Sequence, residues 1–403
     1  MTLDTVLASV SADPLLWSDF NALCDAGGRL AGSSSESSAF TFAAVRMAAI
    51  GPTRNEPAPY AGWLCHEARV IHEPSGEEIP CAPLLGTMPC QDLVLEVKDL
   101  GRGAPGHVGL DGLAVLARHE YPFATHTIHR RVKLNAAREA GAAAFLIVQP
   151  EPGVGPVSGS SGRAGGPGIP ALGIGIEGAA RLLEGGRVRI SIAAEDRPME
   201  TPNLILEIPG RGPEYVVLSA HLDGHSLAES ALDNATGVAA ALAMARAVRP
   251  FVTGAPRGLM LCIFGAEEWA LAGSRSWLGA MDPERRDRMA FNLNLDSIAG
   301  SPKLTALTSG FAKLPGFLTG AVPGLGVHEP LMPNSDHANF AAHGIPATRI
   351  VAGFNEPESR LRLLLTGADK RRLAPEAELR AATLACTRML WEALMAPELD
   401  LRG

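Results

Sequence analysis

The sequence predicts an α/β protein: a three-layer domain in which helices cover both faces of a mainly parallel or mixed sheet, plus a smaller β-rich insert. Two observations lead to this prediction. From about residue 200, strand-like runs alternate with helical ones, as in "EYVVLSA", "TGVAAALAMARAV", "GLMLCIFGA" and "FNLNLDSIAG". The first run is almost continuously apolar, which is typical of a strand covered on both faces. Between about residues 85 and 195 the pattern changes to a glycine-rich mixture of helix and strand.

We therefore expect two domains, because 403 residues exceed one ordinary hydrophobic core. The main domain is predicted to comprise residues 1–84 and 196–403, and the insert residues 85–195. Within the insert, "RRVKLNAAREAGAAAFLIVQP" predicts an amphipathic helix followed by a buried strand. The glycines and serines of "AGGRLAGSSSES" predict a loop between two N-terminal helices, the second from about Ser37 to Ala49.

The composition fits a globular enzyme and argues against several other classes. Of the 403 residues, 46% are hydrophobic and 19% are charged, with a formal net charge of -8. That acidic balance, without a basic stripe, argues against a nucleic-acid partner. No stretch reaches the roughly 18 apolar residues of a membrane span, and the start "MTLDTVLASVSADPLLW" lacks the positive charge of a signal peptide. The six cysteines are scattered, so we expect reduced thiols and a cytoplasmic location.

Polar and acidic residues follow three successive predicted strands. They are His221 and Asp223 after the first strand, Asp233 in the next loop, Glu267 and Glu268 after the second strand, and Asp296 after the third. In "NLNLDS", Asn292 and Asn294 alternate with leucines, so they share a face with Asp296. Because the carboxyl ends of parallel strands meet at one edge of a sheet, we expect these side chains to lie together.

Each of these residues also has an ordinary structural explanation. A surface histidine beside an aspartate is common, Asp233 and Asn234 are typical helix caps, and acids favour the positive end of a helix dipole. Their combination is less ordinary, because crowded carboxylates repel unless a cation lies among them. One histidine with several carboxylates suits zinc or a similar divalent ion, and a carboxylate that does not bind the metal can serve as general base.

The order of "HLD", "LDNATGVA", "FGAEEWALAGS", "NLDS" and "NSDHANFAAHGIPA" resembles the M28 family of metallopeptidases, the co-catalytic zinc aminopeptidases. The loop "GGRLAGSSSES" is similar to the entry loop of that family. Residues 85–195, with "KLNAAREAGAAAFLIV" and "GIPALGI", resemble the protease-associated (PA) insert that some members carry. The resemblance implies the zinc-exopeptidase type of α/β fold.

The resemblance also implies a role for each residue at the strand ends. His221 and Asp296 would bind one zinc ion, Asp233 would bridge two ions, and Glu268 would bind the second. Glu267 would be the general base, and Asp223 would support His221.

One implied ligand does not match. The family takes a histidine for its second metal from a late His-Thr-x-x-Asp motif, whereas "LLLTGADKRRL" has Thr366 and Asp369 but Leu365 at the histidine position. Leucine has no lone pair to donate. Three other histidines are candidates for a substitute ligand or a pocket residue: His337, His343 and His225.

We therefore expect metal-dependent hydrolysis of an amide or peptide bond, of aminopeptidase type, on peptides or amino-acid conjugates. The first zinc site is complete, and the second is altered at Leu365. Two alternatives stay open: specialised acyl-transfer or cyclase-like chemistry on a single metal, and a catalytically degenerate binding module. Glu267 favours an enzyme, because a scaffold needs no general base.

The expected partner is a peptide or small amide substrate. Arg349, Arg360 and Arg362 surround the altered motif, and they either receive a substrate carboxylate or are exposed and solvated. The insert either shapes the entrance of the site or supports a homodimer.

Overall fold

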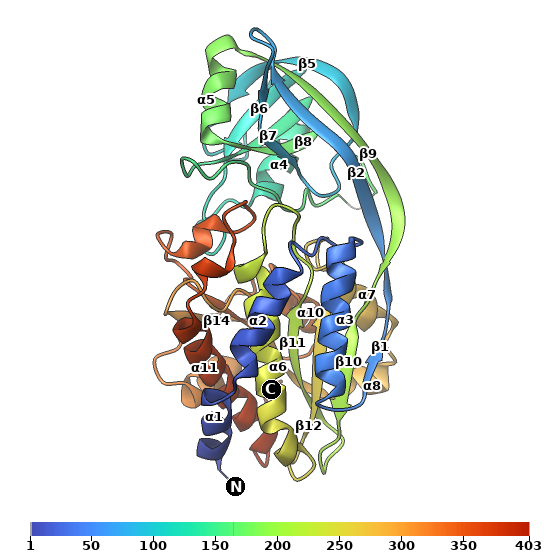
Figure 1. The fold of residues 1–403 in the computed structure, drawn as a ribbon, viewed down its shortest axis with the longest axis vertical. Coiled ribbons are helices and arrows are strands. Elements are labelled where there is room, and N and C mark those ends of the chain that lie inside the picture. Colours follow the sequence, from blue (N-terminus) through green and yellow to red (C-terminus); the bar gives the residue numbers. More distant parts are fainter. Residues whose placement is uncertain (1, 164, 403) are drawn as a thin grey trace. The chain divides into compact units, whose positions relative to one another are not determined.

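The computed structural model describes residues 2–163 and 165–402. The chain divides into two compact units (Figure 1). Unit 1 comprises Met1–Tyr60, Glu200–Leu361 and Asp369–Gly403, and unit 2 comprises Ala61–Met199 and Arg362–Ala368. Two eight-stranded mixed sheets are present, in agreement with the α/β class predicted from the sequence.

The helices and strands of unit 1 alternate along most of its length. They are α1 (Leu3–Ser11), α2 (Leu15–Asp25), α3 (Ser34–Ala48), β1 (Thr53–Asn55), β10 (Leu204–Ile208), β11 (Tyr215–His221), α6 (Thr236–Val252), β12 (Gly258–Phe264), α7 (Ala272–Ala280), α8 (Pro283–Asp287), β13 (Met289–Leu295), β14 (Leu304–Thr308), α9 (Leu314–Ala321), β15 (Gly326–His328), α10 (His337–Ala342), β16 (Ala347–Ala352) and α11 (Glu376–Met395). The predicted strand–helix alternation is therefore confirmed.

The sheet of unit 1 has the strand order β1-β10-β12-β11-β13-β16-β14-β15. At its centre β11 runs parallel to β12 and β13, and β13 runs parallel to β16. The flanking strands β10 and β14 run antiparallel to their neighbours β12 and β16. The four central parallel strands therefore end at a common edge, which positions the residues that follow them.

Helices cover both faces of this sheet. On one face, Val217 of β11 belongs to a cluster that includes Trp277 of α7 and Phe340 of α10. The alternate residues Val216 and Leu218 point to the opposite face and are also fully buried. On that opposite face α6 packs beside α2 and α11, as Figure 1 shows for α2 and α6. The three-layer arrangement predicted from the sequence is confirmed.

The apolar helix α6 is a core element. By length and composition, the segment Ala231–Val252 could cross a membrane, but 78% of its apolar window is buried inside the protein. Such burial is expected of a helix that packs between a sheet and other helices.

Unit 2 is built around the second sheet, of order β3-β2-β9-β5-β6-β7-β8-β4. Its elements are β2 (Ala58–His72), β3 (Glu77–Ile79), β4 (Cys81–Pro83), β5 (Cys90–Asp99), β6 (Leu113–Arg118), α4 (Arg130–Glu139), β7 (Ala144–Gln149), β8 (Ala171–Gly175), α5 (Ile176–Gly185) and β9 (Arg187–Thr201). The amphipathic helix and buried strand predicted from "RRVKLNAAREAGAAAFLIVQP" are α4 and β7.

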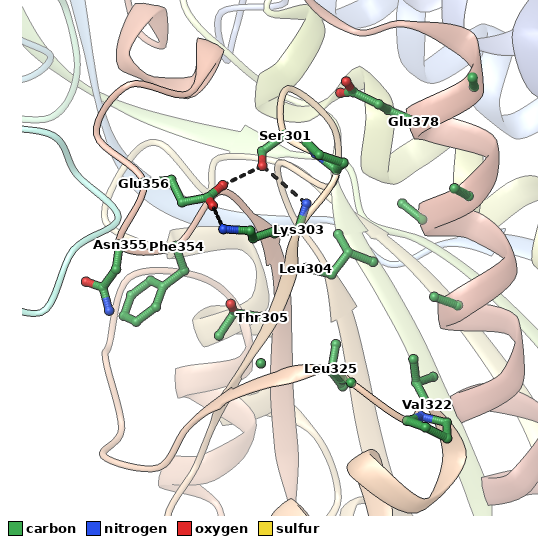
Figure 2. A pocket seen from close by; sticks show the side chains of 18 residues that line it. Ser301, Lys303, Leu304, Thr305, Val322, Leu325, Phe354, Asn355, Glu356 and Glu378 are labelled. Carbon is green, nitrogen blue, oxygen red and sulfur yellow. Dashed lines mark hydrogen bonds and ion pairs between the residues drawn. The ribbon is translucent and has the colours of Figure 1, made fainter.

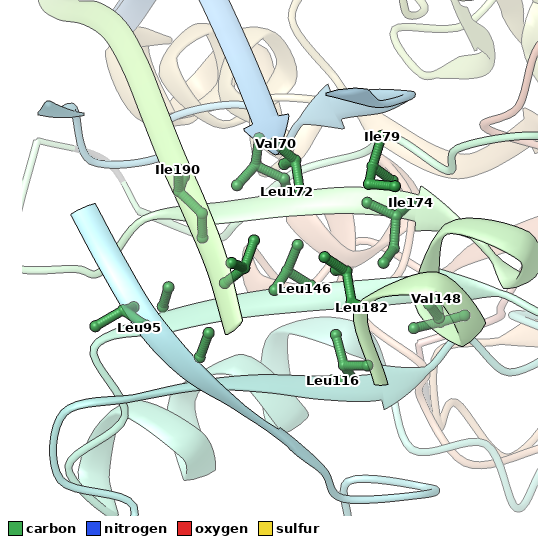
Figure 3. Close-up of a cluster of buried hydrophobic side chains, with 14 of the residues drawn as sticks. Val70, Ile79, Leu95, Leu116, Leu146, Val148, Leu172, Ile174, Leu182 and Ile190 are labelled. Carbon is green, nitrogen blue, oxygen red and sulfur yellow. The ribbon is translucent and has the colours of Figure 1, made fainter. Parts of the chain in front are cut away.

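The core of unit 2 lies between its sheet and α5. Leu116, Leu146 and Leu172 come from three adjacent parallel strands and pack with Leu182 of α5 (Figure 3). The unit starts earlier than the predicted insert, at Ala61 instead of residue 85, because β2 belongs to its sheet.

Candidate metal centre

The candidate residues lie at the carboxyl ends of β11, β12 and β13. His221 is the last residue of β11 and pairs in register with Phe264, the last residue of β12. Glu267 and Glu268 follow β12 after two residues, and Asp296 follows β13 directly. Level strand ends therefore bring the predicted residues to one edge of the sheet.

His221 is surrounded by carboxylates. Its Nε2 atom lies 3.2 Å from Oδ1 of Asp233 and 3.4 Å from Oδ1 of Asp296. Potential ligand atoms of His221, Glu267 and Asp296 all lie within 4.8 Å of one another, and all three residues are buried. Neither carboxylate approaches Nε2 with hydrogen-bond geometry. A buried imidazole nitrogen that faces several carboxylate oxygens fits a divalent metal ion such as zinc.

Asp223 connects the ends of β11 and β12. Nδ1 of His221 lies 3.1 Å from the main-chain oxygen of Asp223 and 3.6 Å from its Oδ1 atom. The carboxylate of Asp223 accepts hydrogen bonds from the main-chain amides of Glu267, at 2.9 Å, and Glu268, at 3.2 Å. Asp223 therefore contacts the imidazole and also holds both glutamates.

Asp233 and Asn234 differ in their contacts, although either could have been a helix cap. Oδ1 of Asn234 accepts from the amide of Gly237 in the first turn of α6, and its Nδ2 donates to the carbonyl of Leu295. The side chain of Asn234 thus joins the first turn of α6 to the end of β13. Asp233 has non-helical backbone angles, and its carboxylate faces His221.

Crowding changes the acidity of the buried groups. Burial raises the pKa of Glu267 well above its usual range, and Asp296 and Glu268 add to the rise while His221 opposes it. Burial alone would lower the pKa of His221, but Glu267 and Asp296 outweigh it, and that pKa is raised. Burial likewise raises the pKa of Asp336, to about 7. The neighbouring carboxylates that add to the rise at Glu267 contribute negative charge that a bound cation would offset.

Glu268, Leu365 and Asp369, which bear on a second metal, have different surroundings. Glu268 lies in unit 1 and is buried beside Glu267. Leu365 belongs to unit 2, where its carbonyl accepts a hydrogen bond of 2.7 Å from the amide of Ser158. Asp369 belongs to unit 1 and accepts from the amides of Leu232, at 2.9 Å, and Asp233, at 3.4 Å. Asp369 therefore supports the turn that carries Asp233.

The three candidate substitute histidines have different environments. His337 starts α10 and is fully buried, and neither ring nitrogen has a hydrogen-bond partner among the described residues. Burial and the nearby Arg349 lower the pKa of His337 to about 3. His225 is buried, and its Nδ1 accepts from the amide of Leu227. His343 is exposed at the end of α10. Within the described residues, none of the three joins the group formed by His221, Glu267 and Asp296.

Arg349 of β16 is a site neighbour whose role the sequence did not reveal. Its guanidinium lies 3.1 Å from Oδ2 of Asp296 and donates to the carbonyl of Asn334. Because Arg349 is only 2% exposed, the interpretation as an exposed, solvated arginine is wrong. The sequence does contain one signal: Arg349 lies inside the apolar strand β16, and a charged side chain within a buried strand indicates an internal ion pair.

The other two arginines near the altered motif also have acidic partners. Arg360 pairs with Glu378, and Nε of Arg362 lies 3.3 Å from Glu151.

A separate pocket of about 830 Å³ lies beside β14, β15 and α11 in unit 1 (Figure 2). At its polar end, Ser301 donates to Glu356 at 2.6 Å, and the same carboxylate lies 2.5 Å from Nζ of Lys303. None of the residues predicted for the metal centre lines this pocket.

The part of the chain that contains His221, Glu267 and Asp296 matches a known protein family. Residues 203–362 match the model of peptidase family M28. The chain is 25% identical over 265 residues to "Probable leucine aminopeptidase 2" of Aspergillus fumigatus, a match that covers 60% of this chain and 51% of the relative. It is 27% identical over 172 residues to "Aminopeptidase YwaD" of Bacillus subtilis, covering 42% of this chain and 37% of the relative. The matched part thus spans about half or less of these curated relatives.

Solved structures share the fold of the whole chain. A zinc aminopeptidase from Bacillus subtilis superposes with a TM-score of 0.75 at 20% identity, over 100% of this chain and 97% of that one. A peptidase M28 precursor from Shewanella amazonensis gives a TM-score of 0.84 at 18% identity, again over 100% and 97% of the two chains. At these identities the likeness establishes the fold.

Proposed function

Because residues 203–362 match the model of peptidase family M28, we propose that the chain is a member of this family and a metal-dependent hydrolase that cleaves amide bonds as an aminopeptidase. The observation that supports this proposal most strongly is the group of buried ligand atoms of His221, Glu267 and Asp296, all within 4.8 Å of one another. Aminopeptidase names among the relatives support the same reaction class.

His221 and Asp296 are the proposed ligands of a first zinc ion, and Asp233, 3.2 Å from His221, is a third. A bound zinc ion would polarise the scissile carbonyl and lower the pKa of a water molecule. Glu267 accepts a proton from the attacking water and passes it to the leaving amine as the carbon–nitrogen bond breaks. Asp223 holds Glu267 in place through the main-chain amide of that residue.

The second metal site is proposed to be altered, because Leu365 replaces the histidine that the family motif supplies. One tightly bound zinc ion, or a weak second one beside Glu268, follows from that replacement. The proposed substrates are peptides or amino-acid conjugates.

Three further assignments stay predictions: that unit 2 is a PA domain, that the protein forms a homodimer, and that it is cytoplasmic. All six cysteines lie within the described ranges and are free thiols, which suits a reducing compartment.

The experiment that tests the function is hydrolysis of a panel of aminoacyl amides and short peptides by zinc-loaded protein. We expect release of the free amine with zinc present and its loss after chelation. If folded, zinc-loaded protein leaves the whole panel intact, the hydrolase proposal is contradicted and a binding module is favoured.

A further inference from the structure

Arg29 makes an unusual set of contacts for a buried arginine. It is fully buried, and its guanidinium donates to the main-chain carbonyls of five residues. The bonds are Nε to Leu222 at 2.7 Å, Nη1 to Leu23 at 3.1 Å, to Gly27 at 3.0 Å and to Glu229 at 2.7 Å, and Nη2 to Ser230 at 2.7 Å. A planar guanidinium with five N–H groups is suited to hold several chain segments in one geometry.

Three of these carbonyls belong to the loop that connects β11 to the turn before α6. Leu222 lies between His221 and Asp223, so one bond fixes the chain beside the candidate zinc ligand. Glu229 and Ser230 lie at the other end of the loop, just before the turn that carries Asp233. Arg29 therefore holds both ends of a loop whose flanking residues face each other across 3.2 Å, from His221 to Asp233.

The main chain around Arg29 strengthens the same connection. The carbonyl of Arg29 accepts a hydrogen bond of 3.0 Å from the amide of Gly224, and Leu30 forms a parallel bridge with Gly224. A Cβ atom on Gly28 would lie 1.9 Å from the carbonyl oxygen of His225, so the two loops touch where only glycine fits. The N-terminal loop thus packs directly on the loop between β11 and α6.

Arg29 itself has a φ of 55°, in the left-handed region that favours glycine. A side chain at this position therefore has a conformational cost, on the order of 1 kcal/mol. The hydrogen bonds of the guanidinium are the contacts that offset this cost.

Charge gives Arg29 a second connection to the centre. Burial lowers its pKa, while Asp369, Asp223 and Asp233 lie near enough to oppose that shift. Asp369 also accepts from the amide of Asp233, at 3.4 Å, so it supports the same turn. A fixed positive charge behind these acids reduces their mutual repulsion.

From these contacts we propose that Arg29 is a positioning residue of the metal centre, which sets the separation of His221 and Asp233 through the loop between them. The inference rests on the proposed function, because it assumes that these two residues bind zinc. Its proposed effect on the zinc ligands is indirect, through the main-chain carbonyls of Leu222, Glu229 and Ser230.

Zinc affinity of the Arg29→Lys variant, measured by competition with a chelating dye, tests this role. Lysine keeps the charge but lacks the planar donors, so we expect zinc affinity to fall at least about 10-fold, the scale found when a residue that orients a metal ligand is changed. Melting of the metal-free protein is measured in parallel.

Arg257→Lys is the matched control. Arg257 lies just before the amino end of β12 and is 4% exposed. It donates to the carbonyls of Ala393 and Ala396 and pairs with Glu214. The Arg257→Lys substitution should lower the melting temperature of the metal-free protein without changing its zinc affinity by more than about 2-fold. If Arg29→Lys keeps wild-type zinc affinity, or if Arg257→Lys loses as much, the positioning role is contradicted.

Hydrogen exchange of the wild-type protein gives a second test that does not depend on the variant folding. The amide of Gly224 donates to the carbonyl of Arg29, so zinc bound at both ends of the loop should slow its exchange. Unchanged exchange at Gly224 on zinc binding would overturn the inference while leaving the hydrolase proposal intact. If the wild-type protein binds no zinc at all, the proposed function itself is contradicted, and the positioning role of Arg29 with it.

Discussion

Buried charges are arranged differently in the two units. In unit 2, Lys133 is almost fully buried, and its Nζ lies 2.7 Å from Glu120 and 2.6 Å from the carbonyl of Arg118. Arg102 pairs with the same glutamate at 2.8 Å. At the sheet edge of unit 1, by contrast, buried acids outnumber the cations that the described residues supply. Charge that is internally balanced indicates a structural role, whereas an unbalanced excess indicates a site for an external cation.

The imbalance in unit 1 is visible in the partners of its acids. Asp296 has Arg349 and His221 beside it, but Glu267 and Asp336 are left with raised pKa values because burial and neighbouring carboxylates prevail. In unit 2 the pKa of Glu120 moves the other way, to about 2, because its bonds to Arg102 and Lys133 outweigh burial. The pKa values of Glu267 and Glu120 thus shift in opposite directions, whereas Asp296, which has Arg349 and His221 beside it, has a lowered pKa like Glu120.

The largest expected effect is on catalysis, from Glu267→Gln. The amide cannot accept the proton of the attacking water, so we expect turnover to fall by roughly 10²- to 10⁴-fold. Rates on an aminoacyl amide and zinc affinity should be measured together. Zinc affinity within about 2-fold of wild type is expected if Glu267 is the base, whereas its loss would show that Glu267 is a ligand instead.

Glu120→Gln serves as the matched control for that experiment. It makes the same chemical change in unit 2, where the carboxylate has cationic partners. Turnover per folded molecule should stay at the wild-type value. A comparable loss of turnover would break the distinction between structural and functional buried acids.

The next effect is on stability, from Lys133→Met. Removal of the ammonium leaves Glu120 with the exposed Arg102 as its cationic partner and the amide of Ile128 as a hydrogen-bond donor, so the free energy of unfolding should fall by about 3 kcal/mol. Urea unfolding measures the loss, and zinc binding should be unaffected. An unchanged free energy of unfolding would show that the buried pair in unit 2 is not a stabilising element.

The smallest effect is a pH dependence that also belongs to unit 2. Because the pKa of Glu120 is about 2 in the folded state, below its value in the unfolded chain, its ion pairs stabilise the protein above roughly pH 4.5. That contribution is lost as the pH falls toward 2. Metal-free wild type should therefore lose more stability than Glu120→Gln between pH 5 and 3 in urea titrations. Equal losses would contradict the assignment.

The sheet and its edge could be predicted from the sequence because they follow from local patterns. Apolar runs mark β11, β12 and β13, and the polar residues directly after them must share an edge once the strands are parallel. The proximity of His221 and Asp296, whose side chains lie 3.4 Å apart, follows from this pattern alone.

The contacts of the arginines could not be predicted, because they depend on which distant segments pack together. Arg29 bonds to Ser230, 201 positions away in sequence, and Arg349 is internal only because β16 is covered on both sides. Composition gives no sign that an arginine is buried until its partners are known. The start of unit 2 at Ala61 was missed for a related reason, since it falls within the continuous strand β2.

The most direct test of the central claim is the zinc content of the wild-type protein after reconstitution and dialysis, compared with His221→Ala. The excess of buried acid at the sheet edge predicts at least one zinc ion per wild-type chain and the loss of that ion in the variant. A folded wild-type protein that retains no zinc, or a His221→Ala variant that retains as much, would contradict the account.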